Sequence, residues 1–151
     1  MFSSQFAVLT GADVIAVGRS AGHLQVAQEL GASEVVDSTK VDPGAYLEDS
    51  LDAVLTFAPS DVVNAGALRA LKWGGTLVTG VPLTFAGFPF NKNQTVIGTL
   101  LGNRGQMNAV LRLAAEGKVR TVVDRFPMAE AAEVLQKLAS GELRSRAVLE
   151  N

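Results

Sequence analysis

Cysteine is absent from this 151-residue chain, and histidine, tryptophan and tyrosine occur once each. Without cysteine, neither a disulfide nor a thiolate metal site can form. Because His23 is the single histidine, a histidine-rich metal centre is also excluded, and we expect no zinc. No run of about 18 or more apolar residues occurs, and the first residues do not resemble a signal peptide. We therefore expect a soluble, cytoplasmic protein with no membrane partner.

Basic residues are too few and too scattered for a nucleic-acid surface. The chain has 13 Lys and Arg against 15 Asp and Glu, and its net charge is −2. Nucleic-acid-binding domains normally carry clustered basic residues, so we expect no nucleic-acid partner. Apolar residues make up 48% of the chain, which is enough for a sizeable core. The length suggests one domain, or one part of a larger protein.

Short apolar runs alternate with amphipathic segments along the chain. Apolar runs predict strands at residues 13–17, 34–36, 51–57, 76–79, 95–100, 121–124 and 146–149. Helical spacing and terminal glycines predict helices at residues 3–10, 21–30, 61–72, 106–116 and 128–139. Turns are expected at residues 42–44 and 74–75. This alternation predicts an α/β fold with a doubly wound, mostly parallel sheet.

For two of the predicted helices the sequence also indicates an N-cap or a buried face. Ser20 is a plausible N-cap for the helix that Gly31 ends. In the helix over residues 61–72, the expected buried face consists of Val62, Ala65, Leu68 and Leu71.

Residues 11–37, GADVIAVGRSAGHLQVAQELGASEVVD, form the most legible segment. They predict a strand, a tight turn, a helix and a second strand, which is half of a dinucleotide-binding unit. The other half, a strand followed by a glycine-rich phosphate turn, would come just before it. Only MFSSQFAVLT stands there.

Six segments in order resemble the medium-chain dehydrogenase/reductase superfamily of zinc-type alcohol dehydrogenases and quinone reductases. They are GADVIAVGRS, ELGASEVVD, LDAVLTFAPS, ALRALKWGGTLVTGVP, VIGTLLGNRGQMNAVLRLAAEGKV and LASGELRSRAVL. Each segment alone is unspecific, but together they cover nearly the whole chain. The resemblance implies a Rossmann-like domain at residues 1–101 that lacks the first strand and the glycine-rich turn. Residues 102–151 would be the returning segment that, in relatives, completes the catalytic domain.

The superfamily's N-terminal domain, which supplies catalytic groups, has no counterpart here, so a missing catalytic domain is a possible partner. We predict no catalytic residue in this chain. The resemblance implies the NADP(H)-binding portion of an oxidoreductase that is inactive alone, with cofactor affinity weakened or lost without the glycine turn. The alternatives are a non-enzymatic dimeric relic or partner subunit without cofactor, and a fragment that is active only with a separate N-terminal chain.

The strongest candidate cofactor residues follow the first predicted strand. An acidic residue at the end of this strand selects NAD, whereas a nearby arginine selects NADP. Gly18 stands in place of the acid, Arg19 offers a planar cationic fork, and Ser20 offers a hydroxyl at a helix start. We therefore favour NADP. The competing interpretation is that Gly18 is a turn residue and Arg19 and His23 are solvated surface groups.

Further candidates follow from the resemblance. Thr56, Phe57 and Ala58 would pass the ribose and adenine side of the cofactor, and Thr79, Gly80, Val81 and Pro82 would line the nicotinamide pocket. The candidates expected at the nicotinamide end of the loop are Leu101, Gly102 and Arg104. Arg146 would reach the pyrophosphate, with Arg144 as the competing assignment. Ordinary strand ends and surface charges are the alternative explanation for all of these.

Loss of the first strand would leave unpaired edges on the strands at residues 13–17 and 51–57. Three repairs are open: direct pairing of these two strands, conversion of QFAVLT into a strand, or a strand from another chain. A second edge is expected near residues 84–98, where Phe85, Phe88, Phe90 and Ile97 suggest a partner surface. We predict a homodimer through these residues.

Overall fold

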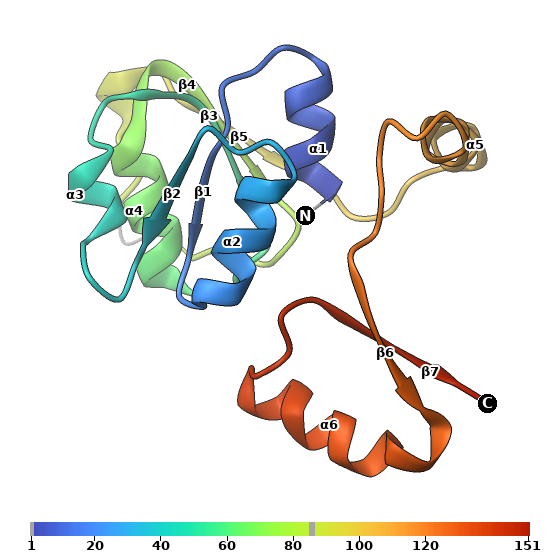
Figure 1. Ribbon diagram of the computed structural model, residues 1–151. Coiled ribbons are helices and arrows are strands. Elements are labelled where there is room, and N and C mark those ends of the chain that lie inside the picture. The colour runs from blue at the N-terminus through green and yellow to red at the C-terminus, as the bar shows by residue number, and fades with distance from the viewer. Residues whose placement is uncertain (1, 85–86) are drawn as a thin grey trace. The chain divides into compact units, whose positions relative to one another are not determined.

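A computed structural model describes residues 2–84 and 87–151 and shows an α/β protein (Figure 1). Its helices are α1 (Phe2–Leu9), α2 (Ala21–Glu29), α3 (Pro43–Tyr46), α4 (Asp61–Ala70), α5 (Arg104–Ala115) and α6 (Ala131–Ser140), with 3₁₀ turns η1 (Phe90–Lys92) and η2 (Met128–Glu130). Its strands are β1 (Ile15–Gly18), β2 (Glu34–Asp37), β3 (Leu51–Thr56), β4 (Leu71–Thr79), β5 (Thr95–Gly98), β6 (Val123–Pro127) and β7 (Arg146–Glu150).

All observed strand pairs are parallel, as the alternation of strands and helices predicts. The hydrogen-bonded orders are β1-β2, β3-β4-β5 and β6-β7. The chain forms two compact units, one comprising residues 38–104 and the other the segments up to Asp37 and from Gly105 onward. The division at residue 101 and the direct pairing of β1 with β3 both stay predictions.

The N-terminal segment is a helix. Residues 2–9 form α1. Gly11, just after the helix, has φ +84°, a conformation that favours glycine and ends helices. The helical prediction for residues 3–10 is therefore confirmed, and the strand alternative for QFAVLT is wrong. QFAVLT forms a helix in spite of its β propensity, because α1 is hydrogen-bonded to the segment that follows α5.

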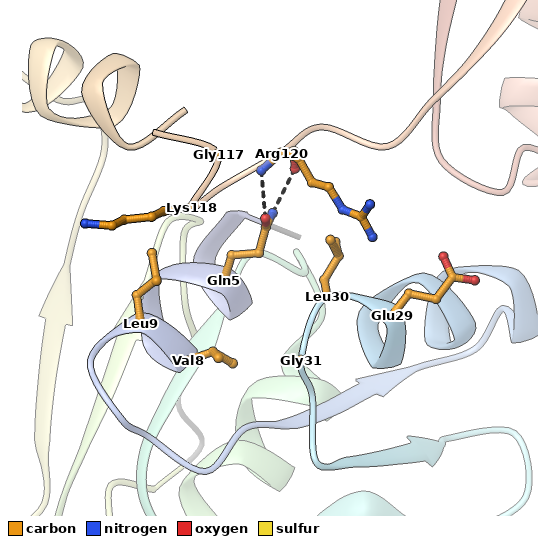
Figure 2. Close-up of a pocket in the computed structure, with 9 residues that line it drawn as sticks. All are labelled: Gln5, Val8, Leu9, Glu29, Leu30, Gly31, Gly117, Lys118 and Arg120. Atoms are coloured by element: carbon orange, nitrogen blue, oxygen red, sulfur yellow. Dashed lines mark hydrogen bonds between the residues drawn. The ribbon is translucent and has the colours of Figure 1, made fainter. Parts of the chain in front are cut away.

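Gln5 provides that attachment. Its Nε2 donates a hydrogen bond to the Arg120 carbonyl at 3.0 Å, and the Arg120 N–H donates to Gln5 Oε1 at 2.8 Å (Figure 2). The two residues are 115 positions apart, so this amide joins both ends of its compact unit. Gln5 is buried, which makes its polar partners obligatory.

In the same unit, α2 packs against β1 and β2 through its buried Leu24, Val26 and Ala27. Gly31, at φ +99°, follows the end of α2 and begins the connection to β2. Toward the C-terminus, α6 packs on β6 and ends at Gly141, which has φ +74°. The predicted helix over residues 128–139 begins instead as the 3₁₀ turn η2.

The other unit consists of β3-β4-β5 with α3 and α4. Its core includes the fully buried Leu71 and Leu77. Leu71 was expected inside a helix, but it begins β4 and pairs with Leu51. The turn expected at residues 74–75 is an irregularity within β4, where Gly74 has φ +74° and the register shifts.

The expected buried face of α4 is partly wrong. Leu68 is buried, but Val62 is 84% exposed and Ala65 is also exposed. The inward positions are taken by Ala67 and by Asn64, which is fully buried. Val62 and Asn64 differ by two positions, so the observed face is rotated away from the apolar stripe that the sequence shows.

Helices α3 and α4 come unusually close together. An ideal Cβ on Gly44 would lie 2.7 Å from the Gly66 Cα, so only glycine fits at residue 44. The segment predicted as a turn at residues 42–44 is the start of α3: Pro43 opens the helix, and the Gly44 N–H donates to Asp42 Oδ1 at 3.0 Å. The short α3 exists because it docks on α4.

Candidate cofactor-binding site

The first group of candidate residues lies where β1 ends and α2 begins. Gly18 is the last residue of β1 and pairs with Asp37 of β2. Arg19 is exposed, and Ser20 is the N-cap of α2 with an extended backbone (φ −96°, ψ 121°). The predicted strand, turn and helix start are therefore confirmed, and they bring Arg19 and Ser20 to the carboxyl end of a parallel strand, where ligands bind in such folds.

The start of α2 is suited to an anion. The Ser20 hydroxyl makes no capping hydrogen bond, and no acidic residue occupies the first turn. The free N–H groups of a helix start and its partial positive charge both favour a bound phosphate or carboxylate. The exposed guanidinium of Arg19 adds a full charge next to them. His23 lies in this first turn and is exposed.

Gly18 is not required by the backbone, because its φ is not positive. A Cβ at this position would lie 3.3 Å from Leu24 Cδ2, a tight contact with the end of a flexible side chain. Leu24 therefore gives Gly18 a structural role in addition to the predicted one. An acidic residue could be placed there with a shift of a few tenths of an ångström in Leu24.

Arg144 and Arg146 are the two alternative candidates for the pyrophosphate contact, and they differ in their surroundings. Arg144 donates to Glu29 Oε2 at 2.8 Å, and its Cα would be 3.6 Å from a Cβ on Gly22. Its side chain thus runs along α2 and is held by an acid at the end of that helix. Arg146 is exposed at the start of β7 and belongs to the same compact unit. Arg146 is therefore the less constrained of the two cations, and its contact with a pyrophosphate stays a prediction.

The second group lies at the ends of β3 and β4. Thr56 and Thr79 are register partners, and both are buried. The Val81 N–H donates to Thr79 Oγ1 at 3.1 Å, and that hydroxyl donates to the Val81 carbonyl at 2.8 Å. In the same way, the Ala58 N–H donates to Thr56 Oγ1 at 3.4 Å. Each threonine thus closes the turn that follows its own strand.

Asn64 is a member of this group that the sequence did not reveal. The Thr56 hydroxyl donates to Asn64 Oδ1 at 3.4 Å, and Asn64 Nδ2 has no protein partner. A buried amide at this position fixes the direction of the Thr56 hydroxyl, since the hydroxyl hydrogen is used toward Asn64. Nothing in the local sequence distinguishes Asn64 from a surface residue of α4.

The remaining candidate residues lie in the segments that follow β3, β4 and β5. Phe57 follows β3 directly, and its ring lies against Gly80, whose N–H donates to the Thr56 carbonyl at 3.1 Å. Leu101 and Gly102 lie on the exposed stretch between β5 and α5, and Arg104 is the first residue of α5. Pro82 is exposed just beyond the Thr79 turn. Whether these residues contact a cofactor stays a prediction.

Two of the pockets among the described residues are lined by none of the predicted cofactor residues. One, of about 300 Å³, lies between α1, the end of α2 and the segment after α5 (Figure 2). It is lined by Gln5, Val8, Leu9, Glu29, Leu30, Gly31, Gly117, Lys118 and Arg120. This is the end of α2 opposite Ser20. The other, of about 620 Å³, is lined by Asp61, Val62, Ala65, Leu68, Arg69, Thr84, Gly87, Pro89 and Lys92.

Two further structural findings bear on the class of protein. Within residues 2–84 and 87–151, no group of three or more His, Asp or Glu side chains is placed to hold a metal ion. None of the helices in these two ranges is both long enough and apolar enough to cross a membrane.

Comparison with known proteins shows that the chain is similar to one family of enzymes in sequence and in structure. The zinc-binding dehydrogenase family matches residues 30–149. An alcohol dehydrogenase of Geobacillus stearothermophilus is 32% identical over 154 residues, which cover 96% of this chain and 45% of that enzyme. The solved alcohol dehydrogenase of the hyperthermophilic archaeon Aeropyrum pernix has a TM-score of 0.85 at 29% identity, covering 99% of this chain and 46% of that one. A solved NAD-dependent alcohol dehydrogenase has a TM-score of 0.83 at 26% identity, covering 99% and 47%.

The parallel strands, with loops at their carboxyl ends, define a Rossmann-like nucleotide-binding fold. The chain belongs to the zinc-binding dehydrogenase family, within the medium-chain dehydrogenase/reductase superfamily, and corresponds to its C-terminal part. It spans 45% of the length of the curated relative. A nicotinamide cofactor is implied by this membership.

Proposed function

We propose that this chain is the NADP(H)-binding portion of an alcohol dehydrogenase- or quinone reductase-like oxidoreductase. The observation that carries the proposal is the arrangement at the end of β1, where Arg19 and Ser20 precede a helix start that has no acid in its first turn. The 2′-phosphate of NADP(H) needs cationic and N–H donors of this kind. The residues present therefore fit the phosphate end of this cofactor.

Preference for NADP(H) over NAD(H) follows from residue 18. NAD selection uses an acidic side chain at the end of this strand to accept hydrogen bonds from the ribose hydroxyls. Gly18 offers no acceptor, and Arg19 offers a charge that only the phosphorylated ribose uses fully. The solved relative described as NAD-dependent makes NAD(H) the natural rival. The experiment is a titration of the chain with NADPH and NADH, in which tighter binding of NADH would contradict the proposal.

The proposed chemistry is hydride transfer. When bound, the nicotinamide supplies or accepts the hydride that is exchanged with a carbonyl, alcohol, quinone or activated alkene. The part of this chain is to bind and orient the cofactor, with Arg19 and Arg146, which belong to one compact unit, at its phosphates. We propose that catalytic groups come from another domain, in the same polypeptide or in a separate one. Mixing this chain with the N-terminal domain of a relative should then restore cofactor-dependent turnover.

A homodimer through residues 84–98 is a second proposal, and it applies with or without a cofactor. β5 is the last strand in the order β3-β4-β5, and Ile97 on it is 48% exposed. Phe90, which precedes it, is 85% exposed, and Phe88 is also exposed. Phe85 lies outside the described residues. Edge strands with exposed apolar side chains favour pairing with a second copy.

The dimer is tested by its mass in solution. Sedimentation analysis of the chain and of an Ile97→Lys variant should show a dimer and a monomer, respectively, because an edge lysine opposes strand pairing. A wild-type monomer at micromolar concentration would contradict this proposal. If the chain forms the dimer but binds neither nucleotide, the non-enzymatic scaffold becomes the better account of its function.

A further inference from the structure

Phe57 presents an aromatic ring where the fold binds ligands. It follows β3 directly, and it is 57% exposed although its neighbour Thr56 is buried. The carboxyl ends of parallel strands are the ligand-binding edge of such sheets. An exposed ring at this edge can offer its face to a planar group of a ligand.

The contact with Gly80 shows how the ring is placed. A Cβ on Gly80 would lie 2.5 Å from both Cδ1 and Cε1 of Phe57 but 3.8 Å from Cγ. Equal short distances to two adjacent ring carbons and a much longer one to the next mean that Gly80 meets the edge of the ring. The faces of the ring are not covered by Gly80.

Gly80 is needed for this placement and not for its own backbone. Its φ is not positive, so other residues could adopt its conformation. Any side chain at residue 80 would push the Phe57 ring aside, because a 2.5 Å contact is impossible. The glycine therefore keeps room for the ring.

The backbone beneath the ring is held by hydrogen bonds on both strands. The Gly80 N–H donates to the Thr56 carbonyl at 3.1 Å, and the Thr56 hydroxyl accepts from the Ala58 N–H and donates to Asn64. On the other strand, the Thr79 hydroxyl closes the turn to Val81. These bonds fix the backbone that carries the ring before a ligand arrives, which lowers the entropic cost of binding.

We infer that Phe57 is a stacking platform for the nicotinamide ring and that Gly80 sets its position. The inference rests on the proposed NADP(H)-binding function and adds to it the half of the cofactor that this residue recognises. The ring leans from β3 toward the turn that follows Thr79, which the resemblance assigns to the nicotinamide. The resemblance alone assigns the Phe57 turn to the ribose and adenine side, so the two assignments differ in a measurable way.

The test compares two ligands on the full chain by calorimetry. NADPH carries the nicotinamide, whereas adenosine 2′,5′-bisphosphate carries only the adenine, a ribose and phosphates. Phe57→Leu should weaken NADPH binding about tenfold, as loss of one aromatic stacking contact does. It should leave binding of the bisphosphate unchanged. Phe57→Tyr keeps the ring and should retain the affinity of the wild type.

Gly80→Ala tests the same platform without removing it. The added methyl displaces the ring and should also weaken NADPH binding about tenfold. In the Phe57→Leu background, Gly80→Ala should add little, since it acts through the ring. Circular dichroism and urea unfolding of each variant confirm that the fold is kept.

Three results overturn the inference, and they are distinguishable. If Phe57→Leu binds NADPH as tightly as the wild type, Phe57 is not a platform. If Phe57→Leu weakens binding of the bisphosphate as much as binding of NADPH, the ring contacts the adenine side of the cofactor. If the wild type binds neither ligand, the proposed function fails and the platform fails with it.

Discussion

The contact between Gly44 and Gly66 gives the sharpest test of the packing in the unit that carries the Thr56 and Thr79 turns. In Gly44→Ala, the new Cβ would lie 2.7 Å from the Gly66 Cα and 3.1 Å from the Gly66 carbonyl oxygen. Ordinary carbon–carbon contact is about 3.5 Å, so α3 and α4 would have to separate by roughly 0.8 Å. Both obstacles are backbone atoms, which no rotamer change relieves.

The expected magnitude follows from this overlap. Insertion of a methyl group into a packed interface costs about 1–3 kcal/mol of unfolding free energy. The reciprocal variant, Gly66→Ala, is a matched control. Its Cβ would lie 3.6 Å from the Gly44 Cα, an ordinary contact, and alanine in a helix interior is favoured over glycine by about 0.5–1 kcal/mol.

Urea unfolding followed by Trp73 fluorescence measures both variants in the correct unit, because Trp73 is the single tryptophan and lies in β4. Gly44→Ala should lower the midpoint, and Gly66→Ala should leave it unchanged or raise it. If the two alanines are equally tolerated, or if Gly66→Ala is the more damaging, the close approach of α3 and α4 is wrong.

Substitutions at three other residues have defined outcomes. Gln5→Leu should destabilise the chain by about 1–3 kcal/mol in urea unfolding, because the Arg120 N–H and carbonyl lose their partners. Gly18→Asp should weaken NADPH and strengthen NADH in a binding titration, and an unchanged ratio of dissociation constants would contradict the role of residue 18. Arg69 donates a hydrogen bond to Glu48 and lowers its pKa below the ordinary value of 4.5, so this pair stabilises the fold above that pH and loses its effect as the pH falls through the lowered pKa. The difference in urea midpoint between the wild type and Glu48→Gln should therefore be present at neutral pH and vanish in acid.

Most of the fold could be predicted because its signals are local. Apolar runs bounded by glycine located the strands, and Gly11, Gly31 and Gly141 ended helices in the left-handed conformation that glycine favours. The order of the segments was sufficient to recognise the superfamily. The helix α1 followed the resemblance against the strand propensity of QFAVLT.

The errors and omissions have a common physical cause, which is contact over long sequence distance. Gln5 is fixed by Arg120, and α3 forms because Gly44 fits against Gly66. The buried face of α4 includes the polar Asn64, whose partner Thr56 is visible only once β3 is placed. Hydrophobic periodicity carries no information on such pairs.

The candidate site was predictable at the level of strand ends. The sequence indicated that Arg19, Ser20 and the residues after Thr56 and Thr79 would follow parallel strands, and the structure confirms that placement. It could not show the threonine hydroxyls that close their own turns, nor the ring edge of Phe57 against Gly80. These features depend on side-chain geometry, which no spacing rule reports.

The central claim is tested most directly by titrating the chain with NADPH and NADH and repeating the titration with Arg19→Ala. The account predicts saturable binding that favours NADPH. In the variant, NADPH binding should weaken by about tenfold or more, as expected for loss of a charge-assisted hydrogen bond, and NADH binding should change little. Equal binding of the two nucleotides, or an Arg19→Ala variant that binds NADPH as the wild type does, would contradict it.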